Sequence, residues 1–350
     1  MKSGDTAARP EVSVIMAVRD GGAFLAEAIA SIRAQSFPDW ELIVVDDGST
    51  DGSDGVLQAA ARSESRLRVI RQERLGLVAA LNRAVAEARG EYLARMDADD
   101  RAHPERLGRQ RAFMAAHREV GVLGSAMRRF GAARGVWRRP VQDADLRAAL
   151  LFEAPFAHPT VMLRRSVWDA AAGEGYREDY RAAEDIDLWA RLAPYTKFAN
   201  LREPLLDYRV HAGQVTAVAT DTMARNGARV RRRWLQQLGL TPTDLEMARH
   251  EAVAWLRAGT AEELRLTGNW LQQIERANSP GGLIEPKALA ALLGRRWFEF
   301  CNAHSRLGWE ARRIYRGVAL GSLDATPRIR RLRFALLCAL RQPARGGRHD

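Results

Sequence analysis

The sequence has little cysteine, little lysine and no long apolar run. Only Cys301 and Cys338 occur among its 350 residues, which excludes a disulfide framework and a zinc site built on cysteine ligands. No run approaches the ~18 apolar residues that a membrane-spanning helix needs, and residues 1–11 contain no apolar segment typical of a secretory signal. We therefore expect a soluble protein of the cytoplasm.

The basic residues are almost all arginine, and they are unevenly distributed. The chain has 54 Lys and Arg, of which three are lysines, and a formal net charge of +11. Residues 1–215 contain 31 basic and 31 acidic residues, whereas residues 216–350 contain 23 and 12. A positive balance suits a polyanionic partner such as nucleic acid, but here the excess lies entirely in the C-terminal part. The charge balance of the first 215 residues argues against a nucleic-acid-binding protein.

Strand and helix patterns alternate through the first half of the chain. Apolar runs rich in β-branched residues predict strands at residues 12–18, 41–46, 67–70 and 91–96. Helical spacing predicts helices at residues 23–34, 53–61, 77–88 and 104–117. This alternation indicates an α/β fold with a parallel sheet and helices on both of its faces. Ligands of such sheets bind at the carboxyl ends of the strands.

The pattern changes along the rest of the chain. Residues 120–209 are mixed, with apolar runs at 161–163 and 204–208 and a helical pattern at 185–192. Strand signals then end, and helices are predicted at residues 225–238, 243–257, 261–276 and 286–303. We therefore expect four parts: a flexible tail (1–10), an α/β domain (11–215), a helical region (216–325) and a basic amphipathic tail (326–350).

Aspartate and glycine gather where three predicted strands end. RDGG follows the first strand, DDGS begins at Asp46 near the end of the second, and DADD (residues 97–100) follows the fourth. A carboxylate only accepts hydrogen bonds, so Asp47 could bind a base imide N–H or ribose hydroxyls. The DADD carboxylates would repel one another without a cation. Mg²⁺ or Mn²⁺ held by one or two carboxylates and substrate phosphates would relieve that repulsion.

Each acidic cluster also has a purely structural interpretation. DDGS is a favourable turn sequence, and Asp99 or Asp100 could cap the helix predicted from residue 104. Two acidic clusters at two strand ends of the same sheet favour a ligand site over two unrelated turns.

Four blocks of sequence resemble the family 2 glycosyltransferases, which have the GT-A fold. In order, they are VSVIMAVRDGGAFLAEAIASIRAQSFPDWELIVVDDGSTDGS, GLVAALNRAVAEARGEYLARMDADD, EGYREDYRAAEDIDLWARLA and LLDYRVHAGQVT. They are similar to the family's opening block, the block ending in its DxD motif, its acceptor-side Glu-Asp motif and its closing Tyr-Arg-x-His segment. The resemblance covers residues 11–217 and does not extend to residues 218–350.

The resemblance implies a nucleotide-sugar donor, usually UDP-linked, and a divalent metal, Mg²⁺ or Mn²⁺. The residues that it places at the nucleotide sugar are Ala17, Arg19, Asp46, Asp47, Asp97, Asp99 and Asp100. Asp46 and Asp47 would hold the nucleoside, Asp97 would lie near the ribose, and Asp99 would coordinate the metal with Asp100 beside it. Arg19 and Asp20 depart from the aromatic residue and Asn that the family often has there.

The third and fourth blocks imply the acceptor side of the site. Asp185 would be the catalytic base of a single inverting displacement, and Glu184 would position the acceptor or the base. His211 would approach the metal or the diphosphate. The residues by themselves allow two simpler roles: the acidic group at 184–187 could complement the dipole of the helix that follows, and His211 could be structural.

Family 2 also contains processive synthases, which carry membrane helices and a Gln-x-x-Arg-Trp motif. The nearest segment here, residues 230–234, reads VRRRW, so we expect transfer of one sugar to a glycan or lipid-linked acceptor of the cell envelope. The competing hypotheses are a sugar nucleotidyltransferase, for which RDGG is a poor phosphate loop, and a nucleic-acid-binding protein. In Arg328–Arg341 arginines flank apolar residues, which predicts weak peripheral contact with the inner face of the cytoplasmic membrane.

Overall fold

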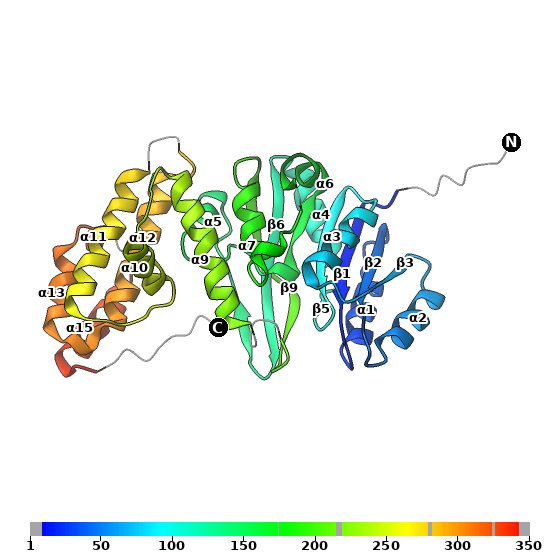
Figure 1. Ribbon diagram of the computed structural model, residues 1–350, viewed down its shortest axis with the longest axis horizontal. Coiled ribbons are helices and arrows are strands. Elements are labelled where there is room, and N and C mark those ends of the chain that lie inside the picture. The colour runs from blue at the N-terminus through cyan, green and yellow to red at the C-terminus, as the bar shows by residue number, and fades with distance from the viewer. Residues whose placement is uncertain (1–8, 174, 215–218, 279–281, 324–325, 343–350) are drawn as a thin grey trace. The chain divides into compact units, whose positions relative to one another are not determined.

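The computed structural model describes most of the chain. The described residues are 9–173, 175–214, 219–278, 282–323 and 326–342 (Figure 1). Residues 1–8 of the expected N-terminal tail and residues 343–350 of the expected C-terminal tail lie outside these ranges. The described residues form two compact units: one runs to Leu146 and includes Pro155–Gly227, and the other contains Arg147–Ala154 and the residues from Ala228 onward. The division after residue 215 that the sequence pattern suggests stays a prediction.

A mixed β-sheet forms the centre of the first unit. Within the described residues it has nine strands: β1 (Val12–Val18), β2 (Trp40–Asp47), β3 (Leu67–Gln72), β4 (Tyr92–Asp97), β5 (Arg101–Ala102), β6 (Val120–Gly131), β7 (Gly135–Trp137), β8 (Met162–Arg164) and β9 (Lys197–Val210). Their order is β3-β2-β1-β4-β8-β6-β9-β5, with β7 paired to β6. The four strands β1 to β4 are parallel, as predicted. The later strands make the sheet mixed, since β8 pairs antiparallel with β4 and β6.

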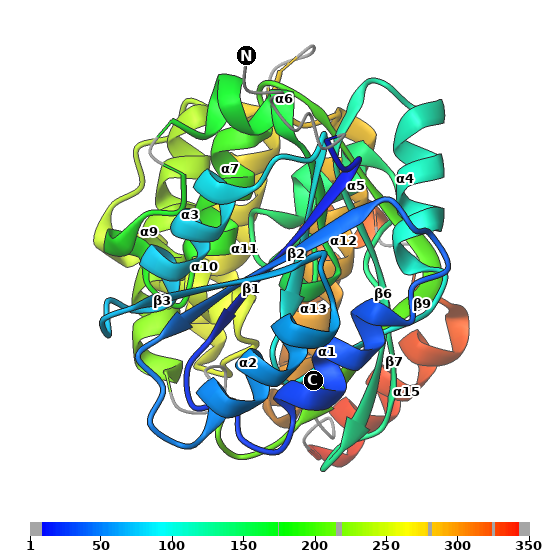
Figure 2. The ribbon, with the colours of Figure 1, turned by 90° about the vertical axis from the view of Figure 1, so that its right-hand side faces the viewer.

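Helices cover both faces of this sheet, as the alternation predicted. In chain order, the helices of this part of the chain are α1 (Leu25–Arg33), α2 (Ser53–Ser63), α3 (Leu77–Glu87), α4 (Arg106–Ala116), α5 (Asp143–Ala149), α6 (Arg165–Val167), α7 (Glu184–Leu192) and α9 (Thr220–Gln237); α5 and α9 include residues of both units. Figure 2 shows α3 on one side of β1–β3 and α1 and α2 on the other. The alternate residues Val12, Val14 and Met16 of β1 join one buried cluster with Leu25 and Ile29 of α1. Ser13 and Ile15 on the opposite face of β1 are buried as well, so the strand is covered on both faces.

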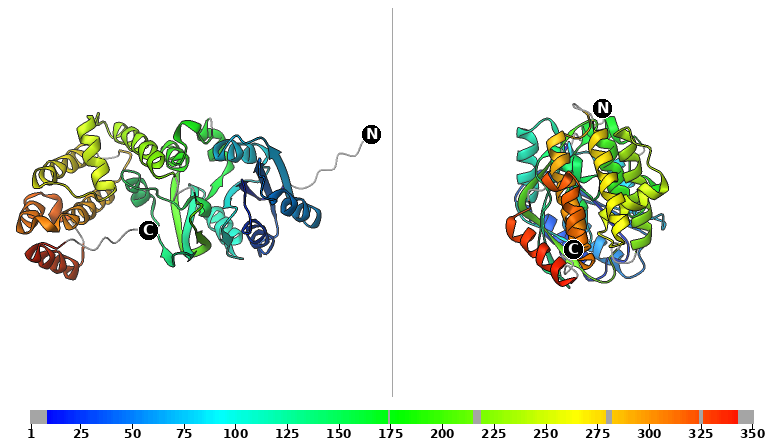
Figure 3. Two further views of the ribbon diagram at one scale, coloured as in Figure 1. Left: turned by 60° about the horizontal axis from the view of Figure 1, so that its bottom comes forward. Right: turned by 90° about the vertical axis from the view of Figure 1, so that its left-hand side faces the viewer.

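The second unit is helical, as expected (Figure 3). Its helices include α10 (Asp244–Ala254), α11 (Ala261–Ala277), α12 (Pro286–Ala303), α13 (Trp309–Gly317), α14 (Leu320–Leu323) and α15 (Arg328–Leu340). Thr243 and Thr260 begin α10 and α11 with capping boxes, in which the threonine and a glutamate three residues later bond each other's backbone N–H groups. Trp270 and Trp297 lie in its core. Within the described ranges, no helix is long and apolar enough to cross a membrane.

Candidate active site

The pairing of neighbouring strands brings the predicted acidic residues to one edge of the sheet. Val18, the last residue of β1, lies beside Asp46 of β2. On its other side β1 pairs with β4, where Ala17 lies beside Asp97. The β4–β5 turn then carries Asp99 and Asp100. The strand ends that the sequence pointed to therefore meet at one place in the fold, where ligands bind in parallel α/β sheets.

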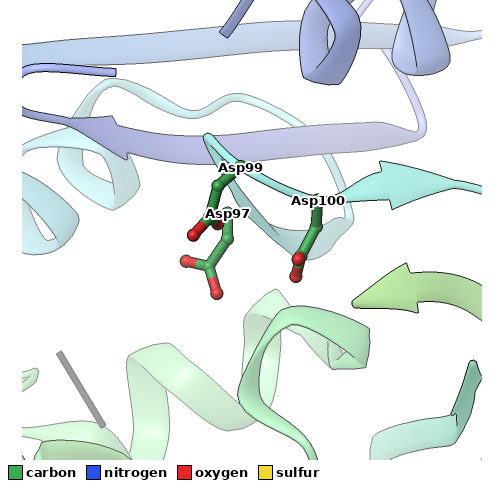
Figure 4. Close-up of side chains that lie close together, drawn as sticks. All are labelled: Asp97, Asp99 and Asp100. Carbon is green, nitrogen blue, oxygen red and sulfur yellow. The ribbon is translucent and has the colours of Figure 1, made fainter. Parts of the chain in front are cut away.

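Asp97, Asp99 and Asp100 form a compact acidic triad. Each offers an oxygen, and these oxygens all lie within 4.8 Å of one another. Figure 4 shows the three carboxyl groups pointing toward the same side. Burial, helped by the charges of Asp97 and Asp99, raises the pKa of Asp100 well above its usual range. Burial also raises the pKa of Asp97.

This triad fits a hard divalent cation. Asp100 is fully buried, and its Oδ2 accepts no hydrogen bond from the described residues. An unpaired buried carboxylate is costly, and a cation that draws on oxygen ligands would compensate it. Oxygen donors of this kind suit Mg²⁺ or Mn²⁺ rather than a soft metal.

The end of β9 holds the triad from the other side. The backbone N–H of Arg209 donates to Asp100 Oδ1 at 2.8 Å, and its Nε donates to the Asp99 carbonyl oxygen at 2.8 Å. His211 Nε2 lies 2.9 Å from Asp99 Oδ2. Antiparallel pairing of β5 with β9 sets this approach. The structure therefore places His211 against the predicted metal ligand, although 112 residues separate the two in sequence.

Arg95 is a residue of this site that the sequence reasoning missed. It lies two residues before Asp97 on β4, so both side chains project from the same face of the strand. Arg95 is 4% exposed and its Nη1 forms an ion pair with Asp97 Oδ1. An arginine inside an apolar strand was the signal, because a charge is rarely buried there without a partner.

Glu184 and Asp185 begin α7; Glu184 is buried, and Asp185 is half-buried. Burial, with a further contribution from the charge of Asp185, raises the pKa of Glu184 to about 7. Burial also raises the pKa of Asp185, and the charge of Asp97 adds to that effect, which indicates that the triad and the start of α7 act on each other electrostatically. Glu184 Oε2 accepts no hydrogen bond from the described residues. Helix-dipole stabilisation does not require such burial, so the dipole alone does not explain this pair.

Tyr176 and His158 form a second buried pair that the sequence reasoning did not predict. The Tyr176 hydroxyl lies 2.9 Å from His158 Nε2. Burial, and then the charge of Arg95, lowers the pKa of His158 well below its usual range, so the ring is neutral. Asn82 holds the Tyr176 backbone through two hydrogen bonds of 2.8 and 2.9 Å. A Cβ on the preceding Gly175, whose φ is +72°, would lie 2.5 Å from Asn82 Oδ1, which explains the glycine.

The two aspartates at the end of β2 have different surroundings. Asp46 is 1% exposed; its Oδ1 accepts from the Ser49 N–H at 3.0 Å, and its Oδ2 accepts no hydrogen bond from the described residues. Both carboxylate oxygens of Asp47 already accept hydrogen bonds from within the protein. Its oxygens accept from Gln72 Nε2 and the Leu75 N–H, both at 2.8 Å, and from the Gly76 N–H at 2.9 Å. Asp47 therefore holds the loop between β3 and α3.

That loop lines a pocket with a basic wall. The pocket has a volume of about 340 Å³, and its lining includes Arg19, Arg74, Gly76, Arg181 and Glu184. Three arginines and Glu184, the first residue of α7, therefore line the same space. A basic wall of this kind suits the negative charge of a phosphate-bearing ligand.

Comparison with known proteins identifies the family. The family model described as "Glycosyl transferase family 2" matches residues 13–170. The chain is 32% identical over 208 residues to the O-antigen biosynthesis glycosyltransferase WbnJ of Escherichia coli, covering 58% of this chain and 80% of WbnJ. This chain belongs to glycosyltransferase family 2. It is also 38% identical over 184 residues to EpsE of Bacillus subtilis, covering 52% of this chain and 66%, just under two thirds, of EpsE.

The fold of this family 2 glycosyltransferase agrees with that assignment. The crystal structure of S. aureus TarS 1-349 in complex with UDP-GlcNAc aligns with a TM-score of 0.57 and 19% identity, covering 88% of this chain and 90% of that one. The predicted GT-A fold, the helical C-terminal region and the enzyme class are confirmed. The roles of individual residues in this glycosyltransferase remain predictions.

Proposed function

We propose that this glycosyltransferase moves one sugar from a UDP-linked donor to an acceptor hydroxyl, with inversion, by single displacement. The observation that carries the proposal is the acidic triad, whose oxygens lie within 4.8 Å of one another, together with the Glu184–Asp185 pair at the start of α7. The triad is suited to binding a metal-bound diphosphate, and the Glu184–Asp185 pair is suited to accepting a proton. The UDP-GlcNAc bound by TarS supports a UDP-linked donor. The role of WbnJ in O-antigen biosynthesis supports a glycan or lipid-linked acceptor of the cell envelope.

The donor would bind across the ends of β1, β2 and β4. Asp46 Oδ2 forms an ion pair with Arg71 Nε at 3.9 Å but accepts no hydrogen bond from the described residues, so it could accept one from a base imide N–H or a ribose hydroxyl. Ala17 would offer its backbone there, and Asp97 would lie near the ribose. Arg19 and Arg74, which line the pocket, would attract the phosphates.

Asp99 and Asp100 would hold the divalent cation, and His211 would approach it beside Asp99. When bound, Mg²⁺ or Mn²⁺ would neutralise charge on the departing diphosphate as a Lewis acid. Arg209 keeps both aspartates in place through its two hydrogen bonds.

Asp185 would act as the base. The acceptor oxygen attacks the anomeric carbon, the bond from that carbon to the diphosphate oxygen breaks, and the electron pair leaves with the diphosphate. Asp185 takes the hydroxyl proton as the new bond forms, a contribution typically of about 10²–10⁴ in rate. Burial raises the pKa of Asp185, which makes its carboxylate a stronger base. Glu184 would position the acceptor or Asp185.

The test is a screen of nucleotide sugars for cation-dependent release of nucleoside diphosphate, with the product's anomeric configuration read by NMR. Asp99→Asn and Asp185→Asn should each reduce turnover by about 10²-fold or more, with unchanged circular dichroism. Asp169→Asn is the matched control, because Asp169 is an exposed aspartate of the same unit. Near-wild-type turnover in Asp185→Asn would refute its role as base, and a retained anomeric configuration would refute single displacement.

A further inference from the structure

Helix α15 is fixed to the helical unit by one of its faces. Phe334 and Cys338 are buried there. The Phe334 ring packs edge-on against Phe298 and Tyr315, each with a centroid separation of 5.8 Å. Beyond the helix, the Gln342 carbonyl oxygen accepts from Ser305 Oγ at 2.7 Å. These contacts decide which way α15 faces.

The opposite face of α15 carries an apolar stripe in contact with solvent. We call Ile329, Leu332, Leu336 and Leu340 the α15 stripe; they are 75, 69, 59 and 56% exposed. Spacings of three, four and four residues place them along one line of the helix. At 100° per residue, Phe334 and Cys338 lie on the far side of the helix from that line. Among the described residues ten large apolar side chains are exposed, and four of them form this stripe.

Arg328 and Arg333 flank the stripe, one on each side, whereas Arg330 lies over the Phe298 ring at 5.6 Å. Arg328, Arg330, Arg331 and Arg333 are all exposed, and α15 contains no acidic residue. Between residues 305 and 342 the sequence has nine arginines and only two acidic residues. Long guanidinium side chains beside an apolar line complement the phosphate layer of an anionic bilayer above its acyl chains.

We propose that the α15 stripe and its flanking arginines dock this enzyme on the surface of an anionic lipid bilayer. The helix would lie in the plane of the interface, with the stripe among the acyl chains and the arginines at the phosphates. The sequence alone predicted weak membrane contact from this segment. The structure shows how the helix is oriented. Phe334 packs inside the helical unit, and the α15 stripe on the opposite face is exposed to solvent. The proposal does not depend on the donor or acceptor of the reaction.

The experiment is flotation of the full-length protein with vesicles. It should bind vesicles of phosphatidylcholine containing about a third phosphatidylglycerol, bind pure phosphatidylcholine weakly, and dissociate in about 0.5 M NaCl. Leu332→Ser with Leu336→Ser should weaken binding by on the order of a hundredfold, because burying each leucine side chain in the bilayer should raise the affinity about tenfold. Arg328→Gln with Arg333→Gln should weaken it by about 25-fold, from about fivefold for each charge.

Leu245→Ser is the matched control, because Leu245 is 69% exposed on α10 of the same unit. It should leave vesicle binding unchanged, and thermal unfolding midpoints of all variants should match the wild type because the substituted side chains are exposed. Equal binding of neutral and anionic vesicles, or unchanged binding of the double-serine variant, would overturn the proposal. A third outcome would also overturn it: neither protein binds vesicles, and light scattering shows a wild-type dimer that dissociates in the double-serine variant. The stripe would then be a contact between two copies of the chain.

Discussion

Asp47 offers a sharp test of how the donor site is built. The family resemblance places it at the nucleoside, whereas the structure shows its oxygens accepting hydrogen bonds from Gln72, Leu75 and Gly76. Leu75 and Gly76 line the basic pocket. We therefore predict that Asp47→Ala acts on nucleotide binding through the loop, and that it destabilises the fold as well.

The magnitude follows from the hydrogen bonds that are lost. The substitution leaves two backbone N–H groups and one side-chain amide without their acceptor, and an unsatisfied buried donor costs about 1–3 kcal/mol. Leu75 is 57% exposed, so water can reach part of this loop and replace some of the lost acceptor. We expect a loss of about 2–4 kcal/mol in the free energy of unfolding.

The assay pairs urea unfolding with titration calorimetry of UDP. Asp47→Ala should lower both the free energy of unfolding and the affinity for UDP, whereas Asp169→Ala, which removes an exposed carboxylate, should change neither. If Asp47→Ala loses UDP binding while its free energy of unfolding stays within about 0.5 kcal/mol of wild type, the reasoning is wrong. The carboxylate would then contact the nucleotide directly.

Three further predictions concern pH, packing and the metal. The pKa of Glu184 is raised to about 7 from an ordinary 4.5, so protonated Glu184 favours the folded state. This stabilisation is complete below pH 4.5 and is lost as the pH rises toward 7. Glu184→Gln should therefore stabilise the protein more at about pH 8 than at about pH 4 in urea unfolding, and a pH-independent effect would contradict this. Gly90→Ala should lower the free energy of unfolding by about 1–3 kcal/mol or more, because the new Cβ would lie 2.5 Å from Ser13 N. Gly55→Ala should raise it by up to about 1 kcal/mol, because Gly55 is exposed on α2 and a Cβ there would have nothing within 4 Å. Equal unfolding midpoints of the two variants would contradict this packing argument. His211→Ala should raise the half-saturating Mn²⁺ concentration by about three- to tenfold in a diphosphate-release assay, and an unchanged value would make His211 structural.

The sequence was most informative where the pattern is local. Residues 12–18 form β1 with the predicted bounds, and the next three strands differ from prediction by one or two residues at an end. By contrast, β6 (Val120–Gly131) was not predicted as a strand, although it pairs with β7, β8 and β9. Its run VGVLGSAMRRFG has glycines and two arginines, which weaken a strand signal, and its stability comes from neighbouring strands.

The same distinction holds at the active site. The DADD run, the Glu-Asp pair and the family resemblance could be seen in the sequence because each lies within a few consecutive residues. The ion pair of Arg95 with Asp97 requires that the strand be buried, and the hydrogen bond between His158 and Tyr176 joins segments 18 residues apart. The use of Asp47 by the loop at residues 72–76 depends on the register of β2 with β3.

The sequence by itself determined the family, the parallel α/β arrangement of the first four strands and the acidic character of their ends. Periodicity and short motifs are properties of neighbouring residues, so they need no knowledge of the fold. Only the tertiary structure decided which carboxylates share a site, which are already occupied and which face of α15 is exposed. Those outcomes depend on side chains that meet from distant parts of the chain, as Phe298 and Tyr315 do with Phe334.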